Sequence, residues 1–254
     1  MVTIWAMVAA QAAGRGARTS VADVCAAAVS KVAVSGAGLI AMTQAGTVHV
    51  ICVTDAASER LADIELTLGE GPCADTAAFG GPVLASDLAD DDIMSRWPVF
   101  SPAAREAGVA AVFAFPLQIG AIRAGVLELY RRKPGPLSTR ALGDALLFAD
   151  TATLLLLDGQ GSASGSASGS AGDADGGTGP GGLPIGLWRR RAEIDQATGM
   201  LTEQLGVRID EAFIRLRAHA YAHDRRLAEV AREIVTGRLR LRPDRESADP
   251  GSAG

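Results

Sequence analysis

Hydrophobic and polar positions along the first 158 residues alternate between a helical period and a strand period. After Thr19 or Ser20, either of which can cap a helix, apolar residues recur every three or four positions from Val21 to Val32. The later pattern predicts strands at 39–43, 48–53, 82–85, 109–118 and 123–131, a hairpin turn at Ala45-Gly46, a helix or turn at 58–68, and helices at 102–107 and 139–157. Strands in the middle with helices at both ends predict an α+β fold for residues 18–158, in which helices cover one antiparallel sheet.

Segments of low complexity or weak pattern flank this domain. Residues 159–183 are almost entirely Gly, Ser, Ala and Asp, so we expect a flexible linker that tethers two domains without fixing their orientation. The apolar run in residues 1–17 lacks a basic region and is too short to span a bilayer, which argues against a signal peptide and a membrane span. We therefore expect residues 1–17 to form a poorly ordered extension. The polar tail at 243–254 is expected to be disordered.

The pattern changes to three short amphipathic helices over residues 184–242. The first helix is expected from about Leu187 to Leu205 and is ended by Gly206. The second is expected to begin near Asp210, and the third near Asp224, a good N-cap residue. Their predicted buried stripes are Ile194, Ala197, Leu201 and Leu205, then Ala212, Phe213, Leu216 and Ala220, then Leu227, Val230, Ala231 and Ile234. Three such stripes on short loops predict a three-helix bundle.

Charge divides the chain in the same place. Residues 1–158 carry 11 basic and 16 acidic side chains, whereas residues 184–242 carry 12 arginines and 8 acidic side chains. The basic half therefore favours a polyanionic partner, although exposed arginines on a small bundle also form an ordinary solvated face. The three cysteines have unrelated spacings and predict neither a disulfide framework nor a zinc site, which favours the reducing cytoplasm.

The C-terminal residues are similar to a known family. The matching pieces are Ile194-Asp195-Gln196-Ala197-Thr198-Gly199-Met200-Leu201, then Glu211-Ala212-Phe213 with Leu216-Arg217, then Leu227-Ala228-Glu229-Val230-Ala231. They resemble the ANTAR domain, an RNA-binding module of bacterial antitermination regulators. The resemblance implies binding to paired hairpins in the leader of a transcript, which prevents a terminator hairpin from forming and so affects RNA polymerase indirectly. Two modules are usually needed, which implies a homodimer.

Eight residues are candidates for RNA contact on this basis: Gln196, Ala197, Thr198, Gly199, Arg217, Tyr221, Arg225 and Arg226. Arginine neutralises phosphates, and bases in RNA loops stack on aromatic or guanidinium planes. Two packing roles stay open beside RNA contact: Ala197 and Gly199 permit close helix packing, and Tyr221 packs at a protein interface. His219 and His223 have a metal-ligand spacing, but no third ligand accompanies them, so no metal is expected.

The N-terminal domain carries a second resemblance. Its residues are Leu68-Gly69-Glu70-Gly71-Pro72-Cys73, Pro82-Val83, Asp87-Leu88, Arg96-Trp97-Pro98 and Phe113-Ala114-Phe115-Pro116-Leu117. With the order of strands and helices, they resemble a GAF domain of the kind that precedes ANTAR modules. This implies sensing of a small molecule, which stays unidentified, or dimerisation through the terminal helices. The signature of cyclic-nucleotide-binding relatives is not evident.

Catalytic signatures are not evident in the sequence, which contains no nucleophile elbow, P-loop or zinc constellation. We therefore expect no enzyme, no cofactor, no metal and no membrane association. Cys25, Cys52 and Trp97 are predicted core residues, Cys73 is expected to be buried and inert after a Gly-Pro turn, and Asp90-Asp91-Asp92 is expected to form a solvated loop.

Together these features favour a regulator whose GAF-like domain controls an RNA-binding module. Two alternatives remain: a DNA-binding regulator that uses the last two helices as a helix-turn-helix, and a GAF-type thiol redox enzyme with Cys73 as nucleophile.

Overall fold

The computed structural model describes residues 3–14, 16, 18–42, 48–120, 122–162 and 185–242. The chain divides into two compact units, Met1–Arg191 and Ala192–Gly254, and each is described by itself. No described helix has both the length and the apolar character needed to cross a membrane.

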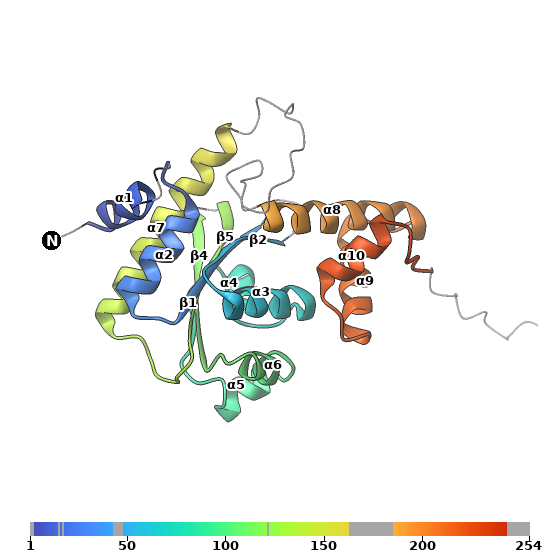
Figure 1. Ribbon diagram of the computed structural model, residues 1–254. Coiled ribbons are helices and arrows are strands. Elements are labelled where there is room, and N and C mark those ends of the chain that lie inside the picture. Colours follow the sequence, from blue (N-terminus) through green and yellow to red (C-terminus); the bar gives the residue numbers. More distant parts are fainter. Residues whose placement is uncertain are drawn as a thin grey trace, which may run out of the picture. The chain divides into compact units, whose positions relative to one another are not determined.

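The N-terminal unit is built on a five-stranded antiparallel sheet with the order β2-β1-β5-β4-β3 (Figure 1). Its strands are β1 (Gly36–Met42), β2 (Val48–Val53), β3 (Val83–Ala85), β4 (Ala111–Ile119) and β5 (Ile122–Arg131). β5 is central and pairs with both β1 and β4. The predicted α+β fold and the strand positions are therefore confirmed, and the predicted turn at Ala45-Gly46 lies outside the described residues.

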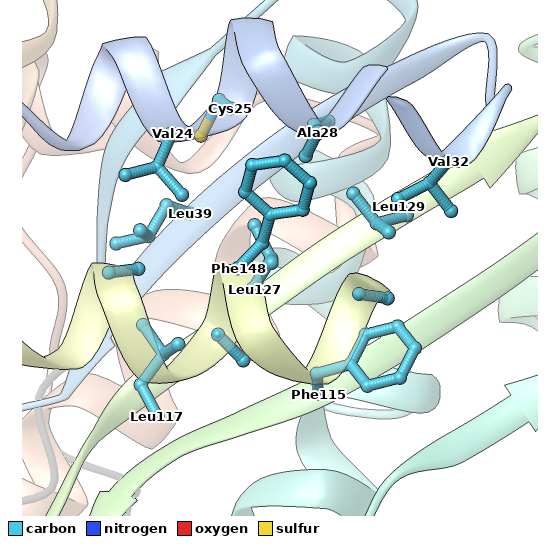
Figure 2. Close-up of a cluster of buried hydrophobic side chains, with 14 of the residues drawn as sticks. Val24, Cys25, Ala28, Val32, Leu39, Phe115, Leu117, Leu127, Leu129 and Phe148 are labelled. Carbon is cyan, nitrogen blue, oxygen red and sulfur yellow. The ribbon is translucent and has the colours of Figure 1, made fainter. Parts of the chain in front are cut away.

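One face of the sheet is covered by α2 (Val21–Val32) and α7 (Thr139–Ser162), and α1 (Ile4–Gly14) packs against these two helices. Ser20 caps α2 as predicted, and both its backbone N–H and its hydroxyl donate hydrogen bonds to Asp23 Oδ2 at 2.8 and 2.9 Å. In the core, Phe148 of α7 lies against Ala28 of α2 and Leu127 of β5 (Figure 2). These contacts bury the apolar stripes of both long helices.

The other face is covered by α3 (Ala56–Leu68), α4 (Pro72–Phe79), α5 (Asp91–Arg96) and α6 (Phe100–Glu106). Trp97 is buried there and meets the edge of Phe100, with ring centroids 5.9 Å apart, which confirms its predicted place in the core. Cys25 and Cys52 are buried in the core on the opposite face of the sheet, beneath α2 and α7, as predicted.

Two predictions about local structure in this unit are corrected. The supposedly disordered start contains α1, which buries Val8 and Ala12 against the domain. Asp90–Asp92, predicted as a solvated loop, instead form the N-cap and first turn of α5, where Asp90 accepts hydrogen bonds from the backbone N–H groups of Asp92 and Ile93. The Gly-Pro turn before Cys73 is present as predicted and leads into α4, and Cys73 is buried. α7 continues to Ser162, and the rest of the predicted linker lies outside the described part of the chain.

The C-terminal unit contains most of α8 (Ile185–Leu205), followed by α9 (Ile209–Ala222) and α10 (Leu227–Val235). Gly206 ends α8 with a φ of +65°, as predicted. Asp224 does not begin the third helix: it has a φ of +50°, its N–H donates to the carbonyl of Tyr221, and α10 starts only after Arg226. The buried apolar side chains are Ile194, Ala197, Leu201, Ala212, Phe213, Leu216, Ala220, Leu227, Val230, Ala231 and Ile234.

Candidate functional sites

The Gly-Glu-Gly-Pro-Cys segment of the N-terminal domain joins α3 to α4 through a tight turn. Gly69 ends α3 in the left-handed conformation, and Pro72 occupies the first turn of α4. A side chain at Gly71, where φ is +131°, would collide with the Glu65 carboxylate. Glycine is therefore required there, because the turn passes directly over that carboxylate.

This turn places Cys73 against two buried glutamates. The N–H of Cys73 donates a hydrogen bond of 3.0 Å to Glu65 Oε1, so Glu65 satisfies one of the open N–H groups at the start of α4. Glu128 reaches the same place from β5, and one donor atom from each of the three residues lies within 4.8 Å of the others. Their exposed fractions are 5% for Glu65, 6% for Cys73 and 1% for Glu128. We call these three residues the Glu-Cys-Glu cluster.

Burial has the largest effect on the pKa values of the three side chains in this cluster. It raises the pKa of Glu65 to about 7, even though the hydrogen bonds from Cys73 act in the opposite direction. Burial and the neighbouring Glu65 carboxyl also raise the pKa of Glu128 well above its usual range. The pKa of the Cys73 thiol is raised by burial and by the two glutamates, which favours the thiol over the thiolate in the absence of a cation.

Two acidic residues near the turn hold the following helices in place. Glu70 Oε1 accepts hydrogen bonds from the backbone N–H groups of Val99 and Phe100 at 2.8 and 2.6 Å, at the start of α6. Asp75 on α4 binds Arg96 Nε at 2.8 Å and Trp97 Nε1 at 3.1 Å. These carboxylates therefore position the helices that cover the same face of the sheet as the Glu-Cys-Glu cluster.

The second candidate site is an exposed face of α9, defined by Ile214, Arg217 and Tyr221. Positions three, four and seven apart lie on one side of a helix, so these residues are neighbours. The side chains of Ile214 and Tyr221 are 60% and 55% exposed. The Arg217 guanidinium lies 5.9 Å from the centre of the Phe213 ring, and burial lowers its pKa from the usual range. We call this surface the α9 face.

The four predicted contact residues on α8 differ in accessibility. Gln196 is exposed and Gly199 is half-buried, whereas Ala197 and Thr198 are buried. The Thr198 hydroxyl donates to the carbonyl of Ile194 at 2.7 Å. In this structure Ala197 and Thr198 support the helix core, so they are not retained as direct RNA contacts. A side chain at Gly199 would meet no atom within 4 Å, which argues against a need for close helix packing at that position.

The arginines before α10 also separate into two kinds. Arg225 forms a two-pronged ion pair with Glu233, with both N–O distances at 2.8 Å, and this ties the α9–α10 loop to α10. Arg226 is exposed and forms no ion pair with any residue that the structure describes. Arg226 is therefore the better candidate for a phosphate contact.

Glu65 and Glu128 were not among the residues predicted from sequence. A lone glutamate inside the run Val126–Tyr130 was a usable signal, because every other side chain in that run is aliphatic or aromatic. The partner was not visible, because Glu65 and Glu128 are 63 positions apart and meet only through the packing of α3 on the sheet.

Comparisons with protein families agree with this division into two domains. A GAF domain model matches residues 18–156 and an ANTAR domain model matches residues 188–235. The chain belongs to the GAF domain family and carries an ANTAR domain at its C-terminal end. ANTAR is an RNA-binding antitermination domain, and GAF domains commonly mediate dimerisation or ligand sensing, so both are regulatory domains.

Several solved domains are similar to the N-terminal domain. A GAF domain of a phosphoenolpyruvate-protein phosphotransferase from Coxiella burnetii is 10% identical, with 63% of this chain and 96% of that chain covered and a TM-score of 0.48. The GAF-B domain of DevS from Mycobacterium smegmatis is 18% identical, with coverages of 56% and 94% and a TM-score of 0.40. A domain of a sensor histidine kinase protein from Sinorhizobium meliloti 1021 is 17% identical, with coverages of 53% and 86% and a TM-score of 0.42. No curated protein matches the chain.

Proposed function

We propose that this protein is a cytoplasmic, sensor-regulated antiterminator, in which the GAF domain controls binding of the ANTAR domain to tandem hairpins in a leader RNA. The observation that carries the proposal is the order of the two domains in one chain. Binding would keep a terminator hairpin from forming and would thereby act on RNA polymerase indirectly. Neither domain needs catalytic chemistry for this role.

The surface of the ANTAR domain supports RNA as the partner. The α9 face offers an aromatic ring for base stacking, and Arg226 offers a cation for phosphate. Gln196 and Gly199 add an exposed amide and a position where an RNA backbone can approach α8 closely. Residues 184–242 carry 12 arginines against 8 acidic side chains, which adds long-range attraction to a polyanion.

We expect the full-length protein to bind structured hairpin RNA with a steep dependence on salt, because each neutralised phosphate releases a counterion. Arg226→Ala should reduce the slope of log K against log salt by about 0.7–1, the value for one lost phosphate contact. The measurement is fluorescence anisotropy at several salt concentrations, with a pool of structured RNA used first to select a ligand. Recovery of no RNA from that pool would contradict the proposal.

Competition between hairpin RNA and duplex DNA separates this proposal from the DNA-binding alternative. If the protein were a DNA-binding regulator, the second helix of its helix-turn-helix would read the major groove, and duplex DNA of matched charge should displace the RNA. For an RNA-binding regulator, we expect duplex DNA to displace the RNA only at the high concentrations at which DNA binds without sequence preference. Duplex DNA that competes as well as the selected hairpin would favour the alternative.

A homodimer is supported by an exposed apolar stripe on α7. Leu147 and Leu154 are seven residues apart, with Leu146 beside them, and all three side chains are exposed. Burial of this stripe in a second copy would remove apolar area from water. The low-complexity sequence between the domains favours control by effective concentration, in which the paired GAF domains hold two ANTAR domains near one another.

We expect Leu147→Glu/Leu154→Glu to convert the dimer to a monomer, because each copy would bury two uncompensated charges in the interface. Sedimentation equilibrium measures the change. The matched control is Ile119→Glu/Ile122→Glu, which changes two exposed apolar residues at the β4–β5 end of the sheet and should leave the dimer intact. A dimer that survives the α7 substitutions would place the interface elsewhere.

A further inference from the structure

The Glu-Cys-Glu cluster concentrates acidic groups in an apolar part of the domain. Glu65 comes from α3, Cys73 from α4 and Glu128 from β5, and their donor atoms lie within 4.8 Å of one another. The surrounding side chains include Ile40, Ala62, Ala114 and Val126. Acidic side chains are almost never fully buried unless they are paired or bind a metal.

Glu65 Oε1 accepts a hydrogen bond from the Cys73 N–H, but Glu65 Oε2 and both oxygens of Glu128 have no hydrogen-bond partner outside the cluster. Their polar neighbours are one another and the Cys73 thiol. Within the part of the chain that the structure describes, no Lys, Arg or His forms an ion pair with either glutamate. Thr76, one turn after Cys73 on α4, is also fully buried with an unpartnered hydroxyl. Open lone pairs are thus gathered on neighbouring oxygen atoms beside a thiol, which favours binding of a cation.

We propose that Glu65, Cys73 and Glu128 bind a divalent transition-metal ion of the zinc type. One sulfur and two carboxylate oxygens suit such an ion, whereas a site for calcium or magnesium would consist of oxygen atoms alone. Metal–ligand bonds of about 2.0–2.3 Å bring donor atoms to within about 4 Å of one another. The present separation of the donor atoms, within 4.8 Å, exceeds this by less than about 1 Å.

A site with three protein ligands leaves a fourth coordination position for water or a small molecule. The bound metal would therefore be either the species that the GAF domain senses or the centre at which the domain binds a small molecule. This regulatory role rests on the proposed function, but metal binding itself does not and can be measured without RNA. Loss of metal binding and loss of RNA binding are thus separate results.

Cobalt(II) is the probe for this site, because a cobalt–thiolate bond gives a charge-transfer band in the near ultraviolet. The full-length protein is unfolded, stripped with a chelator and refolded with Co²⁺, since the buried site has to be filled during folding. We expect about one bound ion per chain with a thiolate band, a tetrahedral visible spectrum, and displacement by Zn²⁺. Cys73→Ser should abolish the thiolate band, and Glu128→Gln should weaken binding by at least about tenfold.

Two controls identify the ligands. Cys52→Ser changes another buried cysteine and should retain the band, and His219→Ala/His223→Ala removes a surface pair that could hold cobalt without thiolate. Folding of each variant is checked by circular dichroism and thermal melting. Refolded wild-type protein that shows no thiolate band and no stoichiometric cobalt would overturn the proposal and leave the two glutamates as a carboxyl pair that shares protons. A band that persists in Cys73→Ser would also overturn it.

Discussion

Glu65→Gln is expected to raise the free energy of unfolding of the metal-free protein by roughly 2–3 kcal/mol at pH 8. The carboxyl group of Glu65 is buried and its pKa is raised from 4.5 to about 7. At pH 8 the folded wild-type domain holds an uncompensated buried carboxylate, whereas the unfolded chain ionises Glu65 in water at no such cost. A Gln side chain removes this charge and still accepts the hydrogen bond from the Cys73 N–H.

The pH dependence has a defined sign. Between about pH 4.5 and 7, the folded state keeps a proton on Glu65 that the unfolded state has lost. Stability of the wild-type domain therefore falls as pH rises through this window and levels off above it. Glu128→Gln should act in the same direction, because burial also raises the pKa of Glu128.

Differential scanning calorimetry of protein that has been unfolded and refolded in the presence of a chelator, over a range from about pH 5 to about pH 8, measures this effect. The difference between wild type and Glu65→Gln should be small at the acidic end and largest at the basic end. Glu106→Gln, at an exposed glutamate that ends α6, is the matched control and should follow the wild-type curve. A difference of equal size at both ends of the pH range would mean that the substitution acts through packing.

Tyr221→Ala is expected to weaken hairpin RNA binding by about 5- to 150-fold, the effect of losing one stacked base. The Tyr221 side chain is 55% exposed near the end of α9, so its loss should leave the thermal stability of the protein nearly unchanged. Tyr221→Phe keeps the ring and should retain most of the affinity. Anisotropy titrations with one selected hairpin at fixed salt measure the three proteins side by side.

Substitutions elsewhere on the same domain test whether this effect belongs to the α9 face. Ile209→Ala removes an exposed apolar side chain at the opposite end of α9 and should not change RNA affinity. Gly199→Ala should stabilise α8 by about 0.5–1 kcal/mol but weaken RNA binding, if the RNA backbone approaches α8 at this position. Equal affinities for wild type and Tyr221→Ala would remove Tyr221 from the interface and favour its role in protein contacts.

Local patterns predicted the elements that have strong local signals. Ser20 and Asp23 cap α2, and alternation and β-branched residues mark β4 and β5, so these elements were visible in the sequence. α1 was missed, because its helix is stabilised by burying Val8 and Ala12 against residues far along the chain. α4 was missed for a related reason: Gly71 and Pro72 indicate a turn, and the helix that follows is secured by Glu65.

The candidate RNA contacts illustrate the same limit. Helical spacing correctly placed Tyr221 away from the apolar stripe of α9 and Arg217 at its border, where Arg217 is half-buried beside Phe213. Helical spacing could not show that Gln196 is exposed and Thr198 is buried on α8, because the width of the buried stripe of a helix depends on what packs against it. Nor could it show that Glu233 engages Arg225 while Arg226 stays exposed, since that depends on how α9 turns into α10.

By itself, the sequence determined the two domains, their order, the antiparallel sheet and the basic three-helix module, because periodicity, glycine breaks and charge are properties of neighbouring residues. Only the tertiary structure decided which of these residues meet. Glu65, Cys73 and Glu128 lie on three elements, and neither burial nor a raised pKa can be read from a residue without its packed neighbours. The fold thus brings together an acidic buried cluster that no local pattern in the chain encodes.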